Sequence, residues 1–289
     1  PNFSEGRDRA TIDALAEALG ARARLLDVHS DPDHNRSVFT LAGGEEELIA
    51  ALLAGVAVAR ERIDLRLHAG VHPCVGVADV LPLVAVRPED MARANATALE
   101  LGGRIGSELG LPVFLYGELA RGRRLAELRR GGVEELARRI ESGEIQPDFG
   151  PATPDPRTGA ALVGARRPLI AFNINLRGSL EVAREIAAAV REGGSPGFPG
   201  VRALGLELPG AGLVQVSMNI EDWTKSGLGE IVARIELEAE KRGAEVAGPE
   251  LVGLIPAGAA AAAEQAGLRF DPSQILERRL ASELGEDCG

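Results

Sequence analysis

The succession of apolar patterns between residues 168 and 254 restricts the fold more than any other feature of this sequence. Alternating apolar residues predict strands, and apolar spacings of three and four residues predict helices. Ser179 is placed to cap the first helix and Gly243 to end the second. The predicted order is strand 168–176, helix 179–191, strands 201–208 and 213–219, helix 227–242 and strand 245–254. This β-α-β-β-α-β order is typical of a ferredoxin-like fold.

The first half of the chain opens with the same order of elements. Its patterns predict a strand at 1–3, helix 8–19, strands 24–28 and 37–42, helix 45–63 and strand 81–86, then helix 88–109, strand 112–116 and helix 123–141. We therefore expect an α+β fold of two consecutive ferredoxin-like (βαββαβ-type) subdomains, residues 1–166 and 167–289. The boundary is expected in the Pro- and Gly-rich loop 145–159 or the strand after it, and two helices within 257–284 close the chain.

The composition indicates a soluble, cytoplasmic, globular protein. Of the 289 residues 45% are apolar and 26% charged, and no apolar run approaches the about 20 residues of a membrane span. No charged leader followed by an apolar segment opens the chain, so we expect no signal peptide. The two cysteines, Cys74 and Cys288, do not indicate a disulfide framework. A net charge of −11 disfavours nucleic acids and membranes as partners.

Five arginines nevertheless cluster between residues 121 and 130. Their spacing is that of one face of a loop and helix, and we interpret the cluster as a solvated surface rather than a binding site. Its members are Arg121, Arg123, Arg124, Arg129 and Arg130.

All four histidines lie in the first half of the chain. They are His29, His34, His68 and His72. Imidazole is the side chain that changes charge near neutral pH, so we expect any acid–base centre in this half.

The loop around His72 is the first candidate for that centre. Pro73 keeps His72 out of helical geometry, and Gly70 and Gly76 bound the loop on either side. Asp79 follows, where it could orient the imidazole and raise its basicity. The structural alternative is an exposed loop histidine and an aspartate that caps a turn.

The polar segment 29–36 is the second candidate, because it is longer and more charged than a hairpin turn requires. Imidazole and carboxylate suit Zn or Mn, so His29, Asp31, Asp33 and His34 form a conceivable metal site. An Asp- and Pro-rich turn with incidental histidines explains the segment equally simply, and we predict no metal. Asn35 and Arg36 are placed to donate hydrogen bonds to an anionic substrate.

Two further regions carry polar residues in unusual places. Residues 148–160 contain enough glycine and proline to let the backbone approach a flat ligand, although simple connecting loops have the same composition. Alternation places the amides of two predicted strands on single sheet faces, where they either satisfy each other or line a groove. These polar residues are Asn173 and Asn175 on one strand, and Gln215, Ser217 and Asn219 on the other.

Taken together, these segments resemble the formiminotransferase domain family. The resemblance extends through nearly the whole chain, and its motifs appear in the family's order. The matching segments are 2–6, 35–38, His72-Pro73 with Gly76 and Asp79, 148–151, 164–166, 170–176 and 215–217.

The resemblance implies transfer of the formimino group of N-formimino-L-glutamate to N5 of tetrahydrofolate, a step of histidine degradation. It implies a folate groove between the two subdomains, no metal and a homodimer. His72 would be the catalytic histidine, with Asp79 or His29 assisting, and Asn35, Arg36, Asn173, Asn175 and Gln215 would contact substrates. The folate-binding loop would be Gly150, Pro151, Ala152, Thr153, Pro154, Asp155, Pro156, Arg157, Thr158 and Gly159.

Two positions depart from the family pattern. Cys74 stands where the family has an arginine after His-Pro, and His29 stands where the animal enzymes have an aspartate. Three alternatives therefore stay open: a folate-binding protein without transferase activity, a transferase that uses N-formylglutamate, and a metal-dependent hydrolase centred on residues 29–34. The bifunctional members add a cyclodeaminase domain, for which we expect no room in this chain.

Overall fold

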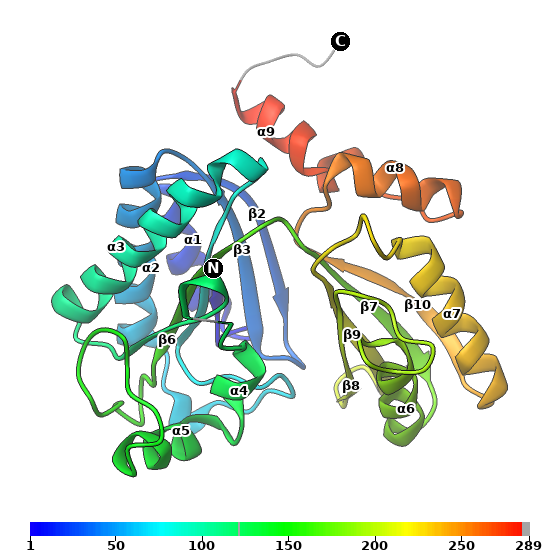
Figure 1. Cartoon of the computed structure of the whole chain (residues 1–289), viewed down its shortest axis with the longest axis horizontal. Coiled ribbons are helices and arrows are strands. Elements are labelled where there is room, and N and C mark those ends of the chain that lie inside the picture. Colours follow the sequence, from blue (N-terminus) through cyan, green and yellow to red (C-terminus); the bar gives the residue numbers. More distant parts are fainter. Residues whose placement is uncertain (121, 285–289) are drawn as a thin grey trace. The chain divides into compact units, whose positions relative to one another are not determined.

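The computed structural model describes residues 1–120 and 122–284. Arg121 and Cys288, both named in the sequence analysis, lie outside the described residues. The chain divides into two compact units, Pro1–Arg167 and Pro168–Gly289, and each combines a sheet with helices (Figure 1).

The described part of the first unit forms a six-stranded sheet in the order β2-β3-β1-β4-β6-β5. The strands are β1 (Asn2–Phe3), β2 (Arg24–Asp31), β3 (Arg36–Ala42), β4 (Ala78–Val84), β5 (Val113–Leu115) and β6 (Ala161–Arg166). The α-helices are α1 (Arg9–Gly20), α2 (Glu45–Arg62), α3 (Met91–Glu108), α4 (Leu125–Arg129) and α5 (Gly132–Glu141). Short 3₁₀ turns lie at Leu65–Leu67, Pro88–Asp90 and Glu118–Ala120.

This sheet is a ferredoxin-like unit with an addition. Strands β1 to β4 and helices α1 and α2 follow the expected β-α-β-β-α-β order, and β1 pairs antiparallel with both β3 and β4. β6 then pairs parallel with β4, and β5 pairs parallel with β6. Parallel neighbours require crossover connections, which helices α3, α4 and α5 provide.

The two faces of the first sheet are covered differently. On one face, Phe3 and Leu81 belong to a core that includes residues of α1, α2 and α3. On the other face, Phe114 and Leu162 pack with Leu128 of α4 and residues of α5. Among the described residues, this second cluster contains none from β1, β2 or β3. The second face of those three strands carries polar side chains such as Asn2 and Arg36 together with Val38, and we call it the polar face of the first sheet.

Two sequence expectations for this unit were wrong in detail. The helix predicted over 123–141 is two helices, because Gly131 and Gly132 adopt φ of 76° and 72°, which interrupts the helix. The fourth strand begins at Ala78 rather than residue 81. Asp79 is therefore a strand residue and not part of the loop that carries His72.

The second unit has the predicted order of elements. Its described residues form a four-stranded antiparallel sheet in the order β10-β7-β9-β8. The elements are β7 (Ile170–Arg177), α6 (Leu180–Val190), β8 (Val201–Leu208), β9 (Leu213–Ile220), α7 (Leu228–Lys241), β10 (Glu245–Val252), α8 (Ala257–Gln265), a 3₁₀ turn at Pro272–Gln274 and α9 (Leu276–Leu284). The expected α+β architecture of two ferredoxin-like units is confirmed.

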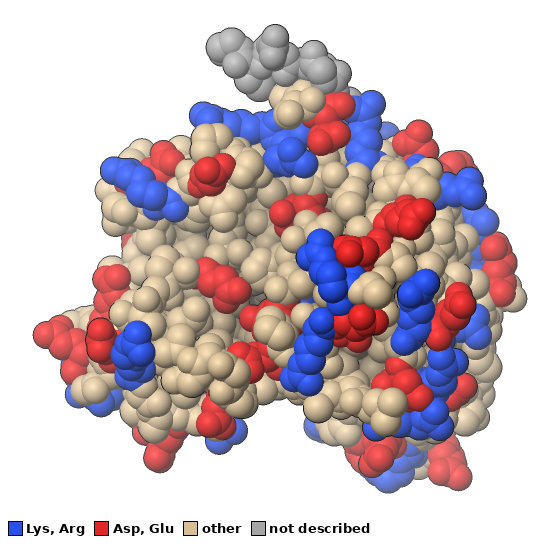
Figure 2. All heavy atoms as spheres, turned by 180° about the vertical axis from the view of Figure 1, so that it is seen from behind, with Lys and Arg blue, Asp and Glu red and all other residues tan. Residues whose placement is uncertain are grey.

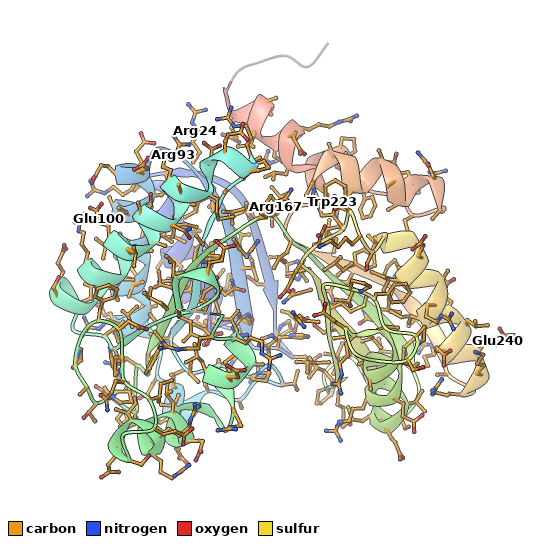
Figure 3. All side chains as sticks on the ribbon, in the orientation of Figure 1. Arg24, Arg93, Glu100, Arg167, Trp223 and Glu240 are labelled. Atoms are coloured by element: carbon orange, nitrogen blue, oxygen red, sulfur yellow. The ribbon has the colours of Figure 1, made fainter. Side chains whose placement is uncertain are left out.

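Helices α3, α6 and α7 are amphipathic. Ile186 of α6 and Ile231 of α7 are fully buried against the sheet of the second unit, whose β7 contributes Ile170. Glu100 of α3 and Glu240 of α7 lie on the exposed sides of their helices (Figure 3). The apolar stripes of α6 and α7 therefore pack with the sheet of the second unit.

Charged side chains of both signs are interspersed over the surface, as the face in Figure 2 shows. The excess of acidic residues is therefore not gathered into one patch on that face. Among the described residues, no helix combines the length and the apolar character that crossing a bilayer requires.

Candidate active site

A bulge in β4 turns a buried aspartate towards the polar face of the first sheet. Asn2 pairs with Val80 and the next residue, Phe3, pairs with Ala78, so Asp79 is the extra residue on β4. A β-bulge redirects a side chain that strict alternation would send elsewhere. The Asp79 side chain is fully buried, so its charge needs partners.

Asp79 obtains those partners from two arginines and one backbone amide. Arg36 of β3 donates from Nη1 to Oδ2 over 2.8 Å, and Arg129 at the end of α4 donates to the same oxygen. The amide of Val75 donates to Oδ1 over 3.0 Å. Burial by itself raises the pKa of Asp79, but the charges of Arg129 and Arg36 outweigh it and hold the pKa well below its usual value.

Besides the charge that it presents to His72, Asp79 has a structural role. Its carboxylate anchors two guanidinium groups and the loop at Val75, whereas the Nδ1 of His72 lies 2.9 Å from the carbonyl oxygen of Pro73. The orientation of the imidazole therefore comes from the loop backbone.

Arg129 is a site residue that the sequence analysis assigned to the solvated surface. Only 13% of its side chain is exposed, and its guanidinium points to Asp79. Its Nε atom is buried and has no hydrogen-bond partner among the described residues. Arg124 at the start of the same helix has 67% of its side chain exposed. The sequence spacing of Arg124 and Arg129 does not show which of them is buried. That depends on where α4 ends and on the helix break at Gly131.

The hairpin between β2 and β3 is held by Asn35, which the sequence analysis expected to bind substrate. Asn35 adopts a left-handed φ of 48° and is 7% exposed. Its Oδ1 accepts a hydrogen bond from the amide of Gly6 over 2.9 Å. The amide of His34 donates to Oδ1 of Asp31 over 2.7 Å. These contacts shape the turn that presents Arg36.

The loop that carries His72 packs against this hairpin. The Nε2 of His68 lies 2.9 Å from the carbonyl oxygen of Asn35, and the amide of Val71 donates to the carbonyl of Asp33 over 3.1 Å. The rings of His34 and His72 stack with centroids 5.8 Å apart and planes inclined by 30°. The fold therefore brings three of the four histidines together.

His72 is half-buried, and its surroundings favour the neutral imidazole. Burial has the largest effect, and the positive charges of Arg36 and Arg129 add to it, so that the pKa of His72 lies well below its usual value. The charge of Asp79 opposes this shift, and His34 adds to it only weakly. At neutral pH the ring is therefore an unprotonated base.

His29 lies on β2, opposite Val38 of β3. Residues opposite each other in antiparallel strands share a face, and Val38 and Arg36 are two positions apart. His29 is therefore on the same sheet face as Arg36. Among residues 1–120 and 122–284, no group of three or more His, Cys, Asp or Glu residues is arranged to hold a metal ion.

The predicted folate loop, 150–159, ends against the His72 loop. Gly76 and Gly159 form an isolated antiparallel bridge, the amide of Val77 donates to the carbonyl of Thr158 and the amide of Ala160 donates to that of Val75. A Cβ at Gly76 would lie 1.9 Å from the Ala160 carbonyl oxygen, so only glycine permits this approach. The pairing joins the end of loop 150–159 to the loop that carries His72.

The start of the same loop is fixed by the residues before it. Asp148 accepts hydrogen bonds from the amide of Leu115 and from Arg123, both over 2.7 Å. The amide of Val113 donates to the carbonyl of Phe149 over 2.9 Å. The middle of the loop is exposed, whereas three of its members are buried: Pro154, Thr158 and Gly159.

The amides predicted on the second sheet form one network with a carboxylate that the sequence analysis missed. Glu250 of β10 accepts hydrogen bonds at Oε2 from Asn173 over 3.1 Å and from Gln215 over 3.0 Å. Gln215 also donates to Oδ1 of Asn175 over 2.9 Å. Gln215 is fully buried and Asn173 is 4% exposed. The two strands therefore satisfy each other's amides, with Glu250 as the shared acceptor.

Comparison with known proteins places this arrangement in a family. A sequence model described as the formiminotransferase domain, N-terminal subdomain, matches residues 1–166, and that of the formiminotransferase domain matches residues 171–278. The chain belongs to the formiminotransferase family. The resemblance drawn from the sequence motifs is confirmed.

Curated members of the formiminotransferase family are similar over nearly the whole chain. The chain is 37% identical over 291 residues to a glutamate formimidoyltransferase of Thermoplasma acidophilum, covering 97% of this chain and 95% of that protein. It is 36% identical over 290 residues to a glutamate formimidoyltransferase of Streptococcus pyogenes serotype M1, covering 97% of each. It is 41% identical over 266 residues to a formimidoyltransferase-cyclodeaminase of Sus scrofa, covering 89% of this chain and 49% of that protein.

Cys74 marks the departure of this formiminotransferase-family chain from the expected His-Pro-Arg pattern. Its Sγ lies 3.9 Å from the Nδ1 of His68. Burial raises the pKa of the Cys74 thiol, and the charge of Asp79 raises it further. Cys74 therefore supplies no positive charge, and the cations beside His72 are Arg36 and Arg129.

Proposed function

We propose that this protein is a glutamate formimidoyltransferase, which moves the formimino group of N-formimino-L-glutamate to N5 of tetrahydrofolate. The observation that carries the proposal is a neutral, half-buried His72 beside a buried arginine pair, on a loop joined to residues 150–159. The match of both family models and of full-length formimidoyltransferases supports the same activity.

The reaction needs one proton to move between two nitrogen atoms. N5 attacks the formimino carbon, and the tetrahedral intermediate then loses the nitrogen of glutamate. The proton of N5 must leave and the glutamate nitrogen must gain one. In our proposal the unprotonated imidazole of His72 takes the first proton and supplies the second, a role that contributes about 10²–10⁴-fold in rate.

The other site residues position the reactants. Arg36 binds an anionic group of the substrate, and Asp79 holds Arg36 and the loop at Val75 in place. His29, on the same sheet face as Arg36, assists His72. Holding both reactants in one geometry contributes up to roughly 7–11 kcal/mol to lowering the barrier.

Folate recognition is assigned to two regions. Loop 150–159 contacts the folate, and the second sheet contributes the network of Asn173, Asn175 and Gln215 around Glu250. A carboxylate fixed by two amides suits the N–H donors of a pteridine ring. We also propose that residues 1–166 and 167–289 act as the two functional subdomains of a cytoplasmic homodimer, with light scattering of the purified chain as the test of the dimer.

The test is product analysis. The protein is incubated with tetrahydrofolate and, in separate reactions, with N-formimino-L-glutamate, N-formyl-L-glutamate or no donor, and the folate product is identified by mass and absorbance. We expect a formimino adduct from the first donor, and unchanged rates after chelation. A formyl adduct alone would indicate the related transferase. Folate binding without any product would indicate a binding protein.

A further inference from the structure

The arginine pair beside His72 carries more positive charge than its single carboxylate neutralises. Arg36 and Arg129 both donate to the same oxygen of Asp79. One anion and two cations leave a surplus of one positive charge. Within the described residues, Asp79 is the only carboxylate in ion-pair contact with Arg36 or Arg129. The groups whose charges act most strongly on His72 are Arg36, Arg129, Asp79 and His34.

This surplus charge is largely out of solvent. The side chains of Arg36 and Arg129 are 11% and 13% exposed, and that of Asp79 is not exposed at all. Burial lowers the pKa of Arg36, and the neighbouring charge of Arg129 lowers it further against the opposing effect of Asp79. A buried charge without a full partner is costly, and a bound anion would remove that cost.

The hydrogen-bond donors of the pair also exceed their acceptors. A guanidinium has five N–H donors. Arg36 uses Nε for Asn2 over 3.2 Å and Nη1 for Asp79. Arg129 uses Nη2 for Asp79, and its buried Nε has no partner in the part of the chain that the structure describes. The site therefore has both charge and donors left for an acceptor with two oxygens.

We propose that Arg129 joins Arg36 in binding one of the two carboxylates of the formimino donor, so that the site selects an amidine derived from an acidic amino acid over an uncharged amidine. This inference rests on the proposed function and names the part of the donor that is recognised. Two guanidiniums around one carboxylate form charge-assisted, two-point contacts. Arg129, on α4, supplies the positive charge that Cys74 does not.

Binding of the donor carboxylate by Arg36 and Arg129 would also change the pKa of His72. The charges of Arg36 and Arg129 lower the pKa of His72. A carboxylate bound between them offsets those charges and raises the proton affinity of the imidazole. The donor thereby increases the basicity of the group that must take the proton from N5.

Steady-state kinetics with donor and tetrahydrofolate varied independently test the assignment. Arg129→Gln removes the charge, Arg129→Lys keeps it without the two-point geometry, and Arg124→Gln is the matched exposed control on the same helix. We expect Arg129→Gln to raise the KM for the donor about 10–100-fold, Arg129→Lys to raise it less, and Arg124→Gln to leave it unchanged. The KM for tetrahydrofolate stays constant.

A rise in the KM for tetrahydrofolate instead would assign the carboxylate to the glutamate tail of folate and overturn the proposal. An unchanged KM for the donor would overturn it as well.

A second measurement uses the unaltered protein, so it holds even if Arg129→Gln does not fold. The pKa of His72 is followed by NMR of its ring protons, with and without saturating L-glutamate, and with the uncharged glutaramide as control. L-Glutamate should raise the pKa and glutaramide should not. A shift in a protein without transferase activity would refute the proposed function alone, and no shift in an active protein would refute this inference alone.

Discussion

Each of the two sheets carries a carboxylate on its polar face, but the two carboxylates have different hydrogen-bond donors. In the first unit, buried Asp79 is shared by two guanidiniums and the group is left with a positive charge. In the second unit, the carboxylate of Glu250 accepts hydrogen bonds from the uncharged amides of Asn173 and Gln215. The first arrangement suits a carboxylate, and the second suits the N–H donors of a neutral heterocycle.

The two networks also differ in how much stability a substitution should cost. Loss of the Asp79 charge would leave the two arginines buried without an anion. Loss of the Glu250 charge would leave only neutral hydrogen-bonding groups of similar shape. The first site is therefore expected to tolerate substitution less well than the second.

The largest expected effect is that of His72→Ala. Loss of the base should lower kcat by about 10²–10⁴-fold while tetrahydrofolate still binds, because no folate contact is assigned to the ring. Stopped-flow or steady-state turnover measures the loss, and added imidazole should restore part of it. Turnover close to that of the unaltered protein would remove His72 from the mechanism.

Asp79→Asn should be the most destabilising single change at either site. It leaves Arg36 and Arg129 buried without an anion, which costs about 3–5 kcal/mol of the free energy of unfolding. Urea unfolding at constant pH measures the change. A variant as stable as the unaltered protein would show that the arginine pair does not depend on Asp79.

Glu250→Gln is the matched change in the second unit and should be milder. The side chain keeps its shape but loses its charge, so we expect about 1–2 kcal/mol of destabilisation. We also expect a higher KM for tetrahydrofolate and an unchanged KM for the donor, the reverse of the pattern at Arg129. Equal effects on both substrates would end the division of roles between the two faces.

The smallest effect is a pH dependence of stability that comes from His72. Its pKa in the folded protein is lowered by burial, Arg36 and Arg129, so below about pH 6.5 the unfolded chain binds the proton more readily. The stabilisation that comes from the neutral His72 is present above about pH 6.5. It is lost as the pH falls towards the pKa of His72 in the folded protein. The urea midpoint of His72→Gln should therefore decline less than that of the unaltered protein between pH 7 and pH 5. Parallel declines would contradict the lowered pKa.

Local sequence patterns predicted the structure correctly where proline and glycine restrict the backbone conformation. Pro73, with Gly70 and Gly76, marks a constrained loop, and that loop does carry the imidazole beside the arginine pair. The sequence did not show that Asn35 shapes the hairpin, because a positive φ and its hydrogen bond to Gly6 are visible only in the folded chain.

The sequence patterns did not reveal the site contacts between residues that are far apart in the chain. Arg129 and Asp79 are 50 residues apart and meet only because α4 is short and β4 is bulged. Glu250 meets Gln215 although the two side chains lie on strands β10 and β9, with β7 between them in the sheet.

The sequence alone determined the order of strands and helices, the ferredoxin-like units and the loop of His72, because hydrophobic period, glycine and proline act over a few residues. The tertiary structure decided which arginine turns inward, which carboxylate it meets and which proton affinity His72 has. Those properties arise from charge and burial, which depend on neighbours in space rather than along the chain.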